Sequence, residues 1–203
     1  MTKVARKLKR AIPKGMILFC VAFLISCKSS GGIDVLGPSD ETKQAGDIVF
    51  EANKELKEIK VLYEKNENKR EDLKKAMSTD DTAAVRKLSG EVVDIINDGT
   101  SHAKGALDKI DQARELNVNE DYAEYLRLKW EALNKQLQAF EEYRQAARKL
   151  RDNYDPKNAQ VREAVKTDFK ERSENFRELM EKSRDYSSQA NELAKEVLRK
   201  PRE

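Results

Sequence analysis

The apolar residues between Val92 and Ala113 recur at alternating steps of four and three residues, and this spacing constrains the fold more than any other feature. The positions are Val92, Ile96, Gly99, Ala103, Ala106, Ile110 and Ala113. Alternating steps of four and three place all of them on one stripe of a helix, in the heptad spacing of coiled coils. The sequence therefore predicts a long helix whose apolar stripe packs against neighbouring helices.

Helical stripes of the same kind follow one another from Asp40 onward, separated by short polar breaks. The predicted helices span about residues 40–77, 81–116, 120–153 and 156–200. Asn119 and Asp155 are the expected caps of the last two, with Pro156 at the first helical position. Short breaks force consecutive helices to lie antiparallel. We therefore expect an all-α fold, an elongated antiparallel four-helix bundle (up-down-up-down) of long coiled-coil-like helices.

The first 26 residues differ from the rest of the chain. Residues 1–15 carry six Lys or Arg and no acid, and residues 16–25 are an apolar run of ten. Ten residues are too few for a membrane-spanning helix, which needs about 20. A basic stretch followed by a short apolar run is typical of a cleaved signal peptide. An uncleaved anchor and an ordinary signal peptide are the alternatives.

The leader ends in Leu24-Ile25-Ser26-Cys27, which resembles the lipobox of bacterial lipoproteins. The resemblance covers only the leader and Cys27. It implies that Cys27 receives a diacylglyceryl group on sulfur, that cleavage falls between Ser26 and Cys27, and that the new amine is acylated. No other cofactor is expected. The chain then divides into a signal peptide (1–26), a lipidated flexible tether (27–39) and a helical bundle (40–203).

The resemblance also implies where the protein resides. We expect a bacterial cell envelope location, with the chain held by membrane lipid through Cys27 and the body in the periplasm or at the cell surface. Lys28 follows the cysteine, in place of the aspartate that retains some lipoproteins at an inner membrane. In a source with two membranes, this favours the outer membrane.

The charge distribution argues against a nucleic-acid partner. Removing the six basic residues of the leader from the 40 Lys and Arg leaves 34 against 37 Asp and Glu, a net charge of −3. Basic and acidic residues are interleaved along the body, so no basic stripe is available to follow a phosphate backbone.

Sequence motifs for catalysis or metal binding are missing, and we expect neither an enzyme nor a metal site. The chain has a single histidine, His102. Residues 97–101 are poor helix formers, and Asp98 lies one turn before His102. This stretch could form a kink with a ligand site at Asp98 and His102, or a break in the helix. We favour a continuous helix with a locally satisfied histidine, because the apolar spacing continues through Gly99 and Ala103.

Two functions fit these features. The first is a membrane-anchored, non-catalytic lipoprotein whose bundle acts as a spacer or binds an unidentified envelope protein. The alternative is a ligand-binding or sensory module of an envelope system, with a cavity between the helices. A polar cluster facing inward would favour the alternative, and only residues 97–102 suggest one.

Overall fold

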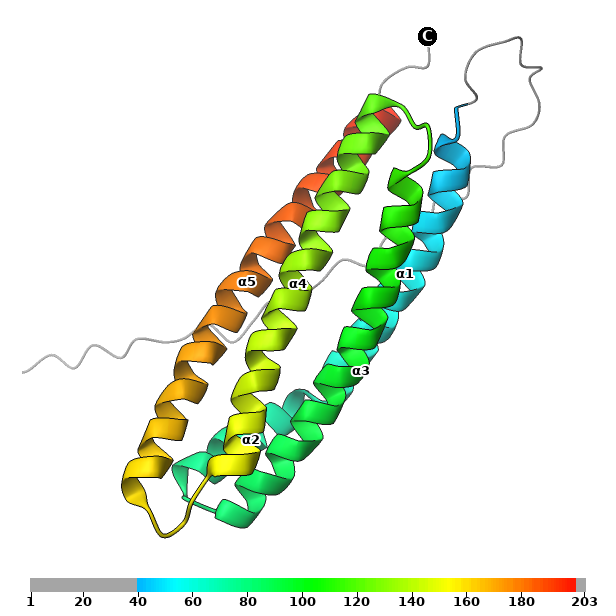
Figure 1. Ribbon diagram of the computed structural model, residues 1–203. Helices are drawn as coiled ribbons and strands as arrows, with labels where there is room; N and C mark the ends of the chain where they lie inside the picture. Colours follow the sequence, from blue (N-terminus) through cyan, green and yellow to red (C-terminus); the bar gives the residue numbers. More distant parts are fainter. Residues whose placement is uncertain (1–39, 200–203) are drawn as a thin grey trace, which may run out of the picture. The chain divides into compact units, whose positions relative to one another are not determined.

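The regular secondary structure of the described residues is all α-helix, which confirms the all-α class. The computed structural model describes the backbone of residues 40–199 and the side chains of residues 40–196. Within this part there are five helices and no strands (Figure 1): α1 (Thr42–Lys65), α2 (Glu67–Ser78), α3 (Thr82–Arg114), α4 (Glu120–Asn153) and α5 (Ala159–Arg199). The predicted signal peptide, lipobox and tether lie outside the described residues.

The predicted first helix, residues 40–77, is divided in two at Asn66. Asn66 donates a side-chain hydrogen bond to the carbonyl of Leu62 at 2.8 Å, and its backbone N–H bonds to the carbonyl of Tyr63 at 3.2 Å. Asparagine is a poor helix former because its side chain competes for backbone partners in this way. Residues 64–72 also lack an apolar side chain that could hold a straight helix against the core. As a result, α2 turns away from the line of α1 (Figure 1).

The long helices pack as neighbours in chain order. α3 packs against α1, α2 and α4, and α5 packs against α4. Figure 1 shows α3, α4 and α5 side by side, with α1 and α5 on the two outer sides. α1 and α5 do not pack closely against each other. A seam is therefore left between them, with α4 at its base.

The core consists of two apolar clusters at successive levels of the helices. One joins α2 to the first half of α3, the second half of α4 and the first half of α5, and its buried residues include Leu73, Val85, Val92, Tyr143, Leu150, Tyr154 and Phe169. The other joins α1 to the second half of α3 and the first half of α4, and its buried residues include Val49, Ala52, Ala106, Ile110, Leu126 and Leu133. α2 therefore covers one level of the core and α1 covers the other.

An arginine fixes α2 to this core. The Arg70 guanidinium lies over the rings of Tyr63, Tyr143 and Phe176, at 5.5, 5.3 and 5.4 Å from their centroids. Its Nη1 donates a hydrogen bond to the Tyr63 hydroxyl at 2.7 Å. Cation–π contacts of this kind strengthen when they are withdrawn from water. The three rings therefore hold α2 at its angle after the break at Asn66.

The heptad spacing on α3 predicted its buried face correctly. α3 is continuous through Gly99, and all seven positions of the stripe from Val92 to Ala113 are buried. In two other helices the apolar spacing predicts that Ile48 and Val161 face inward, and the structure differs at both. Val49, and not the neighbouring Ile48, is the buried residue of that turn of α1, and Val161 is exposed at the start of α5.

Candidate functional site

The turn between α2 and α3 places an acidic side chain at one end of the helices. Asp80 has a φ of 55°, in the left-handed region that aspartate tolerates better than most residues. The next residue, Asp81, caps α3 by accepting a hydrogen bond from the Ala84 N–H at 3.0 Å. With Asp81 turned toward the helix, the Asp80 carboxylate is free to reach other elements.

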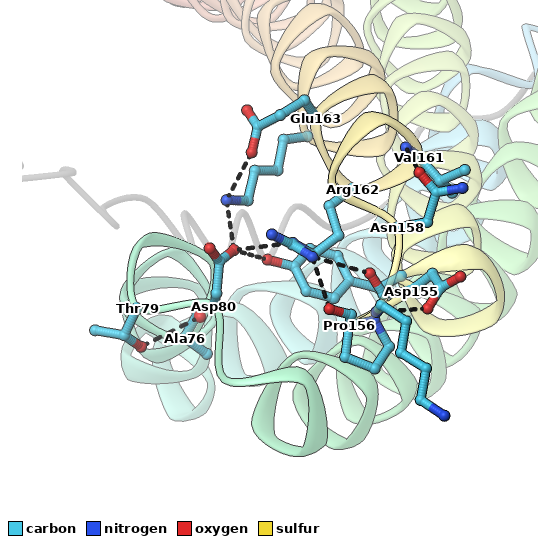
Figure 2. A network of polar contacts seen from close by, with 12 residues as sticks. Ala76, Thr79, Asp80, Asp155, Pro156, Asn158, Val161, Arg162 and Glu163 are labelled. Atoms are coloured by element: carbon cyan, nitrogen blue, oxygen red, sulfur yellow. Dashed lines mark hydrogen bonds and ion pairs between the residues drawn. The ribbon is translucent and has the colours of Figure 1, made fainter.

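The Asp80 carboxylate joins this turn to the end of α4 and the start of α5. Its Oδ1 accepts hydrogen bonds from the Tyr154 hydroxyl and from Lys166 Nζ, both at 2.7 Å. Arg162 Nε lies 3.6 Å from the same oxygen (Figure 2). The bonds from Lys166 and Tyr154 hold the pKa of Asp80 below its usual value, and the bond to Asp80 raises the pKa of Lys166. Burial raises the pKa of Tyr154. We call Asp80, Tyr154, Arg162 and Lys166 the Asp80 network.

The loop between α4 and α5 differs from the prediction at its cap. Asp155 does not cap a helix beginning at Pro156; it accepts a hydrogen bond from the Lys157 N–H at 2.8 Å within a turn. Arg162 Nη1 donates to the carbonyls of Asp155 and Pro156, which stabilises that turn (Figure 2). The cap is Asn158, whose Oδ1 accepts from the Val161 N–H at 3.1 Å. α5 therefore begins three residues later than expected.

An open depression of about 500 Å³ lies beside this loop. Its lining mixes charges of both signs with apolar groups: Arg86, Lys149, Asp152, Asp155, Val161 and Val165. Lys149 pairs with Asp168 at 2.8 Å, and Arg86 donates to the Tyr154 carbonyl at 3.1 Å. Val161 is 36% exposed within this rim of charges. The depression therefore combines an exposed apolar side chain with charged groups of both signs.

The predicted pair of Asp98 and His102 is not joined in the structure. His102 Nδ1 lies 2.8 Å from Glu55 Oε2 of α1, and Asp98 is exposed with no hydrogen bond to His102. Lys109 Nζ lies 3.2 Å from the other oxygen of Glu55. His102 and then Lys109 hold the pKa of Glu55 below its usual value. The cluster links α1 to α3, while a ligand role for Asp98 and His102 stays a prediction.

The other predicted site residues fall outside what the structure describes. Leu24, Ile25, Ser26 and Cys27 all precede residue 40. Within residues 40–196, no group of three or more His, Cys, Asp or Glu side chains is arranged to hold a metal ion. Among the described helices, none combines the length and apolar character needed to cross a bilayer.

The residues that join the elements across long sequence distances could not be paired from the sequence. Asp80 and Lys166 are 86 positions apart, and Glu55 and His102 are 47 apart. Such pairs depend on the relative register of different helices. The one local signal was the run Ser78-Thr79-Asp80-Asp81, whose composition is typical of a turn and a cap.

Comparison with known proteins does not assign the chain to a group. No protein-family model matches it, and neither a curated protein nor a solved structure does so.

Proposed function

We propose that the protein is a membrane-anchored lipoprotein of the bacterial cell envelope, with a non-catalytic helical body that acts as a spacer or protein-interaction module. The anchor is supported by the lipobox-like Leu24-Ile25-Ser26-Cys27 at the end of a basic and apolar leader. Several acyl chains on Cys27 would hold the protein durably, because each buried methylene contributes about 0.8 kcal/mol. In a source with two membranes, Lys28 favours the outer one.

The observation that carries the spacer role is that the two ends of the helical body differ. The tether would enter at the start of α1, where the Glu41 N–H bonds to the Asn117 carbonyl of the α3–α4 connection at 2.8 Å. The depression with Val161 lies at the other end of α4. α4 has 34 residues, so the two ends are about 50 Å apart at 1.5 Å per residue. A lipid anchor at one end would present the depression well away from the membrane.

We infer that α1 and α2 together take the place of the first helix in an up-down-up-down four-helix bundle. The other three helices of the bundle are α3, α4 and α5. The Arg70 contacts with three aromatic rings support this, because they hold α2 against the same core. α2 would then complete the bundle at the level of the depression.

The test of the anchor uses the full chain expressed in a bacterium. Wild type should separate with the membranes and take up labelled palmitate. The Cys27→Ala variant should take up none and retain the leader as a larger precursor. A wild-type chain that stays in the soluble fraction without label would contradict the proposal.

The interaction role is tested at the depression, in the lipid-anchored chain. A photo-reactive amino acid in place of Val161 should give a discrete protein adduct in intact cells. Lys170, exposed on the same helix, serves as the matched control and should give none. Equal labelling from both positions, or no adduct from Val161, would remove the support for an interaction surface at this end.

The alternative function, a module that binds a ligand in a cavity between the helices, is favoured by one specific observation. A small cavity opens in the seam between α1 and α5, and Lys129 is the one charged residue among the described residues that line it.

A further inference from the structure

A cavity of about 100 Å³ lies where α1, α4 and α5 meet. It exists because α5 packs on α4 while α1 and α5 do not close over the seam between them. Lys129 and Gln136 of α4 and Ser187 and Asn191 of α5 supply polar groups to its lining. Leu56 of α1 and Leu133 of α4 supply apolar ones.

Among the described residues that line this cavity, Lys129 is the only charged one. Its Nζ donates a hydrogen bond to Asn53 Oδ1 at 2.8 Å and lies 5.6 Å from the centre of the Tyr125 ring. Among the described residues, no carboxylate lies within 4.0 Å of it. Burial lowers the pKa of Lys129 to about 8. Lys129 is partly buried, and a bound anion would stabilise a partly buried cation that has no anionic partner.

The neutral polar groups around Lys129 are suited to the same kind of ligand. The Gln136 and Asn191 amides and the Ser187 hydroxyl can all donate hydrogen bonds, and none of the described residues in the lining is acidic. The neighbouring Ser183 hydroxyl already donates to the Ala132 carbonyl at 2.7 Å. Leu56 and Leu133 would contact a short apolar group on the ligand.

We propose that this cavity binds a small aliphatic monocarboxylate, with its carboxylate against the Lys129 ammonium and its alkyl chain against Leu56 and Leu133. The volume limits the size of the ligand. A cavity of about 150 Å³ holds benzene, which has six carbons, so about 100 Å³ suits an acid of a few carbons. The inference goes beyond anchoring and spacing, because a chain without lipid would hold the same ligand.

The experiment is a titration of the full chain with butyrate, followed by the amide NMR shifts of the protein. Butyrate should produce saturable shifts at amides near residues 129–136 and 183–191. Butyramide has the same shape without the charge, and it should bind about ten- to hundredfold more weakly, as expected for loss of a charge-assisted hydrogen bond. Equal affinity for the two compounds, or no saturable shift with butyrate, would overturn the proposal.

Variants locate the ligand in the cavity. Lys129→Met keeps the length of the side chain and removes the charge, and it should weaken butyrate binding by about ten- to hundredfold. Lys135→Met, on the same helix but outside the cavity, is the matched control and should leave the affinity unchanged. Ser187→Leu should abolish binding by filling the cavity while Lys129 stays in place. Butyrate binding that survives both Lys129→Met and Ser187→Leu would place the ligand elsewhere and refute the assignment.

The titration is independent of Cys27, so it can fail while the lipoprotein proposal stands. The lipoprotein proposal can likewise fail while butyrate binding is observed.

Discussion

Gly99 provides a sharp test of how α3 packs against α4. It is buried in α3, and a Cβ atom added there would lie 3.5 Å from Cε2 and 3.8 Å from Cζ of Phe140. These are ordinary van der Waals distances, so alanine fits without displacing the ring. Alanine is favoured over glycine in a helix interior by up to about 1 kcal/mol. We therefore expect Gly99→Ala to raise the free energy of unfolding by about 0.5–1 kcal/mol.

Leucine at the same position should have the opposite effect on packing. Its side chain would extend from Cβ into the space of the Phe140 ring, and overpacking typically costs about 1–3 kcal/mol. Gly90 is the matched control, because it lies in the same helix and a Cβ there would meet only the flexible Arg151 side chain, at 3.7 Å. Both leucine variants gain the same helix propensity. The difference between Gly99→Leu and Gly90→Leu therefore isolates the crowding, at about 1–3 kcal/mol.

The assay is urea unfolding of the full chain, followed by circular dichroism. With a slope of about 2 kcal/mol per molar urea, the midpoints of the two leucine variants should differ by about 0.5–1.5 M. Phe140→Ala should bring the Gly99→Leu midpoint closer to that of its own parent, because it makes room for the leucine. Equal midpoints for Gly99→Leu and Gly90→Leu would show that Gly99 does not lie at a close helix contact.

Three further predictions concern the core and the polar clusters. Leu133 is 2% exposed, so Leu133→Ala should lower the free energy of unfolding by about 2–5 kcal/mol, measured from the urea midpoint; a neutral effect would contradict its burial. His102→Gln should change the stability by less than about 1 kcal/mol, because the pair with Glu55 is partly exposed; a larger loss in the same urea assay would refute this. The pKa of Asp80 is lowered in the folded state, so its stabilisation is present above about pH 4, the unfolded value, and is lost as the pH falls through the folded pKa. Thermal unfolding of wild type and Asp80→Asn should therefore converge as the pH is lowered from 7 to 3, and a gap that stays constant would exclude this linkage.

The helices were predictable where local sequence determines them. The heptad spacing from Val92 to Ala113 predicted the buried face of α3, and Asn119 caps α4 as expected by accepting from the Tyr122 N–H at 2.9 Å. The division at Asn66 was missed because the apolar positions Leu62 and Leu73 stay in phase across it. The polar run between those two residues was the available signal for a break.

The polar clusters could not be predicted, because they depend on which helices lie next to each other and in what register. Asp98 was chosen as the partner of His102 from its spacing on one helix, while the structure brings Glu55 from α1. Lys129 has an ordinary position within a charged helix in the sequence. Only the open seam between α1 and α5 distinguishes it, by leaving it partly buried without an acid.

The central claim, that this chain is a lipid-anchored envelope protein, is tested most directly by the mass of its mature N-terminal peptide. The full chain is purified from bacterial membranes, digested and analysed by mass spectrometry. We predict a peptide that begins at Cys27 and carries a diacylglyceryl group on sulfur together with an acyl group on its amine. An unmodified Cys27, or a mature chain that begins at any other residue, would contradict the account.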